Sequence, residues 1–298
     1  MTSSPTSVET GAPTSVVTGL DEADQPLLLA VAPNGARKTR ADHPAVPITP
    51  DQLAAEAKAC LRAGANMIHL HVRDARGGHL LDAAAYGAAS AAIRSAVGED
   101  LIVQITTEAV GIYTPDVQRA VVLETQPEAV SLGLREFVPT GSAAEIAAHG
   151  AFLATLAERG VMAQHILYDA ADLDRFQRLR QDGVIPAGPV QVLFVLGRYA
   201  AGQRSHPRDL LPFLQGWQPV HSHDLWAVCA FGARETAVMA AAAALGGHIR
   251  VGFENNQTLA DGTVAPDNAA LVHAAAQAAL ASGRSPASAS EIRRYCLK

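Results

Sequence analysis

The sequence predicts an α/β fold of the TIM (β/α)8 barrel type, which fills residues 25–298 as a single domain. Short apolar segments with β character alternate with longer helix-like segments, and this unit occurs eight times. Some of these segments, such as residues 190–196, are apolar on both faces, as parallel strands covered by helices are. The length of 298 residues suits eight such units.

The first four units each consist of an apolar segment and the helix that follows it. Thr49 is expected to cap the first helix, and Pro50 suits the first helical position. Pro115 marks the beginning of the third helix in the same way. The strands are predicted over residues 27–32, 66–72, 101–106 and 129–132, and the helices over 50–63, 83–97, from 115 onward, and 145–159.

The last four units keep the same alternation. A doubly wound sheet is the alternative fold, but it needs a glycine-rich first turn, and residues 33–36 read Pro-Asn-Gly-Ala. The alanine-rich segment over 235–245 favours a helix. The strands are predicted over residues 161–168, 190–196, 225–230 and 248–253, and the helices over 171–181, 207–214, 235–245 and 267–281.

The composition excludes several classes of partner and location. The chain has 23 Lys and Arg against 29 Asp and Glu, with no basic run, so neither nucleic acid nor an anionic membrane surface is expected to bind it. No apolar run reaches the length of a membrane span. Cys60, Cys229 and Cys296 lie far apart, which indicates a reducing compartment. Residues 1–24 lack the features of a signal peptide, so we expect a disordered tail on a cytoplasmic protein.

Two histidines and a glutamate form the candidate metal site. His69 and His71 end the second predicted strand and share one of its faces. Glu254 follows the eighth strand, and strands eight and two flank strand one in a closed barrel, so the three side chains can converge at its carboxyl end. This ligand set is typical of a catalytic zinc site with an open coordination position. His221 and His223 have the same spacing but precede strand seven, at the opposite rim, and are interpreted as loop residues.

Other polar side chains are expected at the same rim. Arg250 shares a face with Glu254, where it either supports that carboxylate or holds a substrate carboxylate. Thr106 and Glu108 have the same parity at the end of strand three, so both can face the barrel mouth. The alternative for Glu108 is a helix-capping residue on an exposed loop. Asp74 is a candidate partner that orients a ligating histidine.

Asn34, Ser131 and Arg198 follow or end other strands, and they also belong to this rim. Arg198 can bind a phosphate or a carboxylate, but a solvated loop arginine is the simpler interpretation. A serine in a turn at a strand end is common, so Ser131 alone indicates little.

Five segments form an ordered set of motifs: 34–36 (Asn-Gly-Ala), 69–74 (His-Leu-His-Val-Arg-Asp), 104–107 (Gln-Ile-Thr-Thr), 194–197 (Phe-Val-Leu-Gly) and 246–254 (Gly-Gly-His-Ile-Arg-Val-Gly-Phe-Glu). Together they resemble the β-keto acid cleavage enzymes over roughly residues 27–285. The resemblance implies a TIM barrel, a zinc ion and a homotetramer. It also implies acyl exchange, in which a β-keto acid and acetyl-CoA give acetoacetate and a new acyl-CoA.

The resemblance implies roles for individual residues as well. Zinc would be held by His69, His71 and Glu254. The family's strand-eight arginine corresponds to Arg250, and its strand-three hydroxyl corresponds to Thr106. The expected catalytic residues are Glu108, Arg250 and Thr106, and the expected substrate-binding residues are Asn34, Ser131, Thr107, Asn255 and Arg198.

Three positions depart from the family pattern. The family usually places Asp, its proposed general base, after the zinc-binding Glu, and this chain has Asn255 there. Strand five lacks the family's Glu, and the turn after strand six lacks its Pro-Gly-Gly. Because an amide cannot accept a proton as a carboxylate can, we expect Glu108 to be the base, with His165 as the second choice.

Two other functions are compatible with the sequence. A zinc hydrolase of the amidohydrolase type also carries a His-x-His motif at a strand end, but it needs further His and Asp ligands at later strands. A non-catalytic barrel that binds a metal and a small molecule is the second alternative. A purely structural zinc would favour four protein ligands and no open position.

Overall fold

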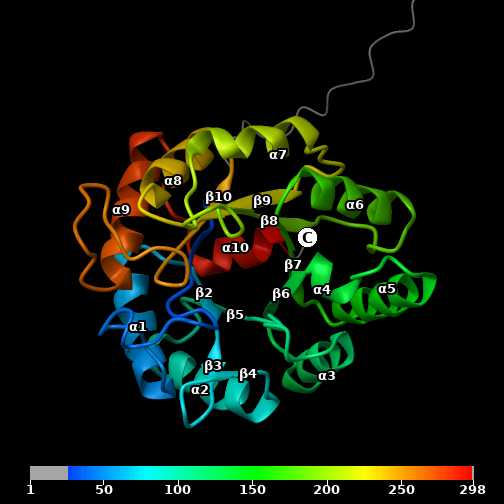
Figure 1. Cartoon of the computed structure of the whole chain (residues 1–298), viewed down its shortest axis with the longest axis horizontal. Helices are drawn as coiled ribbons and strands as arrows, with labels where there is room; N and C mark the ends of the chain where they lie inside the picture. Colours follow the sequence, from blue (N-terminus) through cyan, green and yellow to red (C-terminus); the bar gives the residue numbers. More distant parts are fainter. Residues whose placement is uncertain (1–25, 297–298) are drawn as a thin grey trace, which may run out of the picture.

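The computed structural model describes residues 26–296 and contains a closed barrel of eight parallel strands (Figure 1). Around the barrel the order is β1-β10-β9-β8-β7-β6-β5-β2, so β1 lies between β10 and β2. The predicted TIM barrel is confirmed, whereas the tail predicted over residues 1–24 lies outside the described residues. The barrel strands are β1 (Leu29–Val31), β2 (Met67–Leu70), β5 (Ile102–Ile105), β6 (Ala129–Gly133), β7 (Met162–Leu167), β8 (Gln191–Leu196), β9 (Leu225–Ala230) and β10 (His248–Val251).

Helices surround the barrel and cover the outer faces of its strands (Figure 1). The Thr49 side chain accepts a hydrogen bond from the Gln52 amide and so begins α1, and Gly64 ends this helix with a φ of 114°. Over residues 26–296, no helix is both long and apolar enough to cross a membrane. The helices are α1 (Pro50–Ala63), α2 (Ala83–Val97), α3 (Pro115–Thr125), α4 (Leu134–Phe137), α5 (Ala143–Glu158), α6 (Ala170–Gln181), the 3₁₀ helix η2 (Pro207–Leu210), α7 (Leu211–Gly216), α8 (Glu235–Ala244), α9 (Asn268–Ala281) and α10 (Ala289–Cys296).

Most predicted elements are present with bounds shifted by up to two residues, and two of them differ in kind from the structure. The second strand was predicted to continue to residue 72, but it ends at Leu70, and the chain then forms an antiparallel hairpin of β3 (Val72–Arg73) and β4 (His79–Leu80). The helix predicted over 207–214 is divided into η2 and α7. Pro212 lies in the first turn of α7, where its missing amide hydrogen breaks no helical hydrogen bond.

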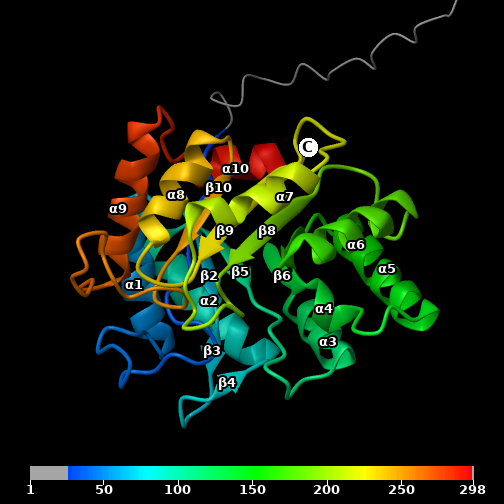
Figure 2. The same cartoon turned by 45° about the horizontal axis from the view of Figure 1, so that its top comes forward.

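The C-terminal helix α10, which the strand–helix pattern did not predict, closes one end of the barrel. Its Ala289 and Ile292 pack against interior residues at the beginnings of the strands. These interior residues are Leu28, Ala30, Met67, Ile102, Ala129 and Met162. Figure 2 shows α10 and the β3–β4 hairpin at opposite ends of the barrel. The carboxyl ends of the strands therefore form the end that α10 leaves uncovered.

Candidate metal centre and active site

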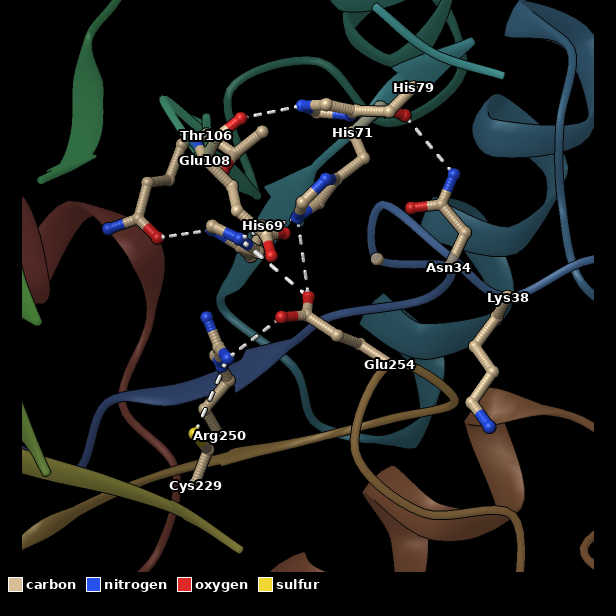
Figure 3. Close-up of polar contacts among 12 residues, drawn as sticks. Asn34, Lys38, His69, His71, His79, Thr106, Glu108, Cys229, Arg250 and Glu254 are labelled. Carbon is tan, nitrogen blue, oxygen red and sulfur yellow. Dashed lines mark hydrogen bonds and ion pairs between the residues drawn. The ribbon is translucent and has the colours of Figure 1, made fainter. Parts of the chain in front are cut away.

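His69, His71 and Glu254 converge at the carboxyl end of the barrel (Figure 3). The Nε2 atoms of His69 and His71 are 3.1 Å apart. Oε2 of Glu254 lies 3.7 Å from Nε2 of His69 and 3.5 Å from Nε2 of His71. Both histidines are buried. Over the described part of the chain, this is the only group of three such side chains whose ligand atoms lie within 4.8 Å of one another. The convergence predicted from strand parity is therefore present.

Two glycines allow Glu254 to reach this position. Gly252 has a φ of 134°, which ends β10, and a Cβ there would lie 2.4 Å from the Ala32 carbonyl oxygen. The Glu254 amide donates a hydrogen bond to the same oxygen at 3.1 Å, so the turn packs directly on the end of β1. At Gly35, a Cβ would lie 2.5 Å from Cγ of Glu254. The close approach of these two backbones therefore positions the carboxylate.

The protonation states of the cluster suit metal ligation. Burial, together with the charge of Arg250, lowers the pKa of His69 to about 3, so this imidazole is neutral. Nδ1 of His69 lies 2.8 Å from Oε1 of Gln104, and this contact places the proton on Nδ1 and the lone pair on Nε2. Burial opposes ionisation of Glu254, but Arg250 and the two histidines outweigh it and hold the pKa well below its usual range.

The unsatisfied oxygen of Glu254 fits a cation. Oε2 is buried and makes no hydrogen bond within residues 26–296, although an unpaired buried carboxylate oxygen is costly. It faces the ring nitrogens of His69 and His71, and Nε2 of His69 carries no proton. Nitrogen and carboxylate oxygen ligands that converge in this way match the donor set of a zinc-class divalent ion.

Arg250 lies beneath the cluster, is buried inside the barrel and lines the base of the pocket. Its Nη2 is 3.2 Å from Oε1 of Glu254 and 3.3 Å from Sγ of Cys229 (Figure 3). The contact with Glu254 is the one that the strand parity suggested. Because the Arg250 guanidinium binds Oε1 of Glu254, Oε2 stays free to face His69 and His71.

The three residues Thr106, Glu108 and Arg198 line the same pocket as the cluster. Nη2 of Arg198 is 3.7 Å from Oε1 of Glu108. Oγ1 of Thr106 accepts the Glu108 amide at 3.0 Å, so the Thr106 hydroxyl proton is available to a ligand. Within residues 26–296, the Glu108 carboxylate forms no hydrogen bond or ion pair with the three candidate metal ligands, and it lines the pocket just after the end of β5.

The other predicted substrate-binding residues, Asn34, Thr107, Ser131 and Asn255, are buried and do not belong to the pocket lining. Asn34 donates to the Pro47 and His71 carbonyls and so holds the backbone of a ligand residue. The Thr107 hydroxyl donates to the Ser131 carbonyl at 2.7 Å. The Ser131 hydroxyl and the side-chain amide of Asn255 are buried and have no hydrogen-bond partner within residues 26–296. Contact between these four residues and a substrate stays a prediction.

Two other candidates, His165 and Asp74, lie away from the pocket. His165 is buried and packs 4.9 Å from the Phe176 ring, on the face of β7 opposite to the pocket-lining Ile166. Its use as a reserve base is therefore wrong for this geometry. Asp74 accepts the Arg76 and Gly78 amides in the hairpin turn, so Asp74 does not orient a ligating histidine.

Sequence reasoning did not assign roles to several residues of the site. Gln104 belonged to a recognised motif, and its parity with Thr106 could have placed it inside the barrel. Cys229, which contacts Arg250, lies near the end of β9, and nothing in the sequence around it indicates a role in the site. The pocket-lining residues without a predicted role are Gly35, Ala36, Arg37, Lys38, Asp42, Ile166, Tyr168, Val195, Gln203 and Phe231.

Known proteins resemble this chain over nearly its whole length. A 3-keto-5-aminohexanoate cleavage enzyme of Fusobacterium nucleatum is 32% identical over 276 residues, which are 90% of this chain and 96% of that protein. A 3-oxoadipate:acetyl-CoA acetyltransferase of Cupriavidus necator is 27% identical over 282 residues, with 90% of this chain and 94% of that protein covered.

Solved structures resemble the chain in fold. Apo ObcA superposes with a TM-score of 0.66 at 18% identity, over 85% of this chain and 65% of that chain. A type I 3-dehydroquinate dehydratase of Clostridium difficile superposes with a TM-score of 0.53 at 11% identity, over 87% and 93% of the two chains. The family model described as beta-keto acid cleavage enzyme matches residues 26–296. This match and the relative at 32% identity show that the chain belongs to the beta-keto acid cleavage enzyme family.

Proposed function

We propose that this enzyme is zinc-dependent and converts a β-keto acid and acetyl-CoA into acetoacetate and a new acyl-CoA. The observation that carries the proposal is the convergence of His69, His71 and Glu254 in a pocket at the open end of the barrel. Membership of the family supports the reaction class. The name of the Cupriavidus relative, which includes acetyl-CoA, supports the acyl donor.

Zinc would be held by His69, His71 and Glu254, and when bound it would supply Lewis acidity toward the ketone oxygen of the substrate. Arg250 keeps Glu254 ionised and turned toward the histidines. Three protein ligands leave a coordination position for a substrate, as in catalytic rather than structural zinc sites.

The acid–base and hydrogen-bonding groups come from the pocket wall. Glu108 is the proposed base, which accepts the proton whose removal generates the carbon nucleophile. Arg198 lies 3.7 Å from this carboxylate and orients it. The Thr106 hydroxyl, whose proton is free, is the proposed donor to a substrate oxygen.

A direct assay tests the reaction. Zinc-loaded protein is incubated with acetyl-CoA and a panel of β-keto acids, and mass spectrometry follows new acyl-CoAs and acetoacetate. We expect both products to appear together. Hydrolysis of amides or esters without a new thioester would favour the amidohydrolase-type alternative, for which residues 26–296 offer no second group of metal ligands. Zinc binding without any turnover would favour the non-catalytic binder.

The assembly and location of the enzyme are part of the proposal. A homotetramer is implied by the family resemblance, and light scattering on the purified protein tests it. A cytoplasmic location agrees with three cysteines that are all free in the structure, namely Cys60, Cys229 and Cys296. Given the mildly acidic charge, neither nucleic acid nor an anionic membrane is proposed as a partner.

A further inference from the structure

The pocket of the metal centre has two cationic side chains that the proposed chemistry does not use. Arg37 and Lys38, in the loop after β1, line the pocket together with the metal-binding cluster. Neither forms an ion pair with an acidic side chain within residues 26–296, whereas Arg250 pairs with Glu254 at 3.2 Å. Asp42 is the acid next to them, but it accepts hydrogen bonds from the Thr39 amide and hydroxyl.

The loop that carries these two cations is held rigidly by Arg73. The Arg73 guanidinium donates to the carbonyls of Asn34, Gly35 and Lys38, at 3.3 Å and 2.8 Å for the first and the last. Because the guanidinium is planar and its N–H donors have fixed directions, these hydrogen bonds hold the loop backbone in one conformation. The backbone that carries Arg37 and Lys38 is therefore fixed before a ligand arrives, which reduces the entropic cost of binding.

The cations lie at a different part of the pocket from the metal ligands. Gly35 packs against Glu254, and the chain then leads outward to Lys38. Figure 3 shows the Lys38 side chain on the far side of Glu254 from His69 and Arg250. A ligand whose keto-acid end lies at the cluster can thus present a second anion to Arg37 and Lys38.

We propose that Arg37 and Lys38 form a specificity site for a second carboxylate, so that the preferred β-keto acid is a dicarboxylate. This inference rests on the proposed function. The phosphates of coenzyme A are the other possible source of an anion. A separate pocket beside the loop after β8, lined by Arg198, Tyr199 and Arg204 among others, adjoins the first one, and its arginines can bind those phosphates. The loop after β1 is therefore assigned to the acid.

The test compares two β-keto acids of equal chain length, a six-carbon 3-oxo dicarboxylate and the corresponding monocarboxylate. We expect native enzyme to favour the dicarboxylate in kcat/KM by about 10- to 100-fold, as for a charge-assisted hydrogen bond. In the double variant Arg37→Met/Lys38→Met this preference should disappear through KM of the dicarboxylate. The monocarboxylate kinetics and KM for acetyl-CoA should not change. Arg40→Met is the matched control, because Arg40 is an exposed residue of the same loop outside the pocket lining.

Three results would overturn the specificity site: equal use of both acids by native enzyme, equal losses for both acids in the double variant, or an increase of KM for acetyl-CoA alone. Calorimetric titration of zinc-loaded protein with the same acids separates this inference from the reaction. Tighter dicarboxylate binding that the double variant abolishes, without turnover of either acid, would contradict only the proposed function. Equal binding of both acids would contradict the specificity site.

Discussion

At the residue scale, the charged side chains of the pocket differ in how they are partnered. Glu254 shares one oxygen with Arg250 and turns the other toward the histidines. Glu108 and Arg198 form an ion pair at 3.7 Å, and a substrate can displace such a long, partly exposed pair at a small cost in free energy. Lys38 has no acidic partner within 4.0 Å among residues 26–296. The first pair therefore shapes the candidate metal site, and Lys38 remains available to a ligand.

Removing one candidate ligand should remove the metal. His69→Ala takes away a neutral nitrogen ligand and exposes the others to competition from water, so we expect strong loss of the single zinc ion per chain by elemental analysis. His221→Ala should retain the ion, because His221 lies outside the cluster although it belongs to the other His-x-His motif. Equal losses from the two variants would contradict the assignment.

Replacing the proposed base should affect the rate and leave the metal in place. Glu108→Gln keeps the size of the side chain and removes its ability to accept a proton, so we expect kcat to fall by about 100- to 10,000-fold. The zinc content should be unchanged because Glu108 is not a member of the ligand cluster. Glu158→Gln, an exposed position at the end of α5, is the control. Full activity of Glu108→Gln would contradict its role as the base and would leave Glu108 only the ion pair with Arg198.

At the element scale, the end of β10 is the structural feature on which the candidate metal site depends. The strand stops at Val251, two residues earlier than the predicted 253, because Gly252 takes a φ that side chains rarely adopt. This turn brings the Glu254 amide onto the Ala32 carbonyl at the end of β1. Two neighbouring strands therefore determine where the third ligand lies.

Gly252→Ala should damage the metal site and the stability together. The new Cβ would lie 2.4 Å from the Ala32 oxygen, so the turn must move and carry Glu254 with it. Backbone strain of this kind costs about 1–3 kcal/mol. We expect weaker zinc binding by competition with a chelator and a lower free energy of unfolding by urea titration. Gly262→Ala also has a positive φ but no atom within 4 Å of its Cβ, so it should lose stability and keep its zinc affinity.

At the scale of the whole molecule, the barrel has one closed end and one open end. Ile292 of α10 is 1% exposed and packs on the first interior residues of the strands. The pocket with the metal-binding cluster lies at the other end. Stability and chemistry are therefore separated along the barrel axis, as is usual for this fold.

This separation predicts the effect of a substitution in α10. Ile292→Ala leaves a cavity under the barrel, so we expect a loss of about 2–5 kcal/mol in the free energy of unfolding. The zinc content should not change, because the helix does not reach the cluster. Arg294→Ala, at an exposed position of the same helix, should have a small effect on stability. A loss of zinc in the folded Ile292→Ala variant would show that the two ends are coupled.

An element of the fold could be predicted from the sequence where the residues that determine it lie within the element itself. The bounds of α1 and α2 agree with the prediction, because a capping residue and a helical period lie within each segment. The β9 bounds agree as well, since this strand is a continuous apolar run. The hairpin after β2 and the helix α10 were missed. Ile292 finds its partners at positions such as Leu28, which are distant in the sequence and carry no local sign of the contact.

The sequence by itself determined the barrel and the candidate metal-binding cluster, because strand parity and strand order are enough to bring His69, His71 and Glu254 to one rim. Only the tertiary structure decided what surrounds them. It turned His165 toward the helices and gave His69 its partner Gln104. It also placed Lys38 in the pocket. The conformation of a loop depends on contacts distant in sequence, here the Arg73 guanidinium that binds the carbonyls of the loop after β1, and no local pattern encodes them.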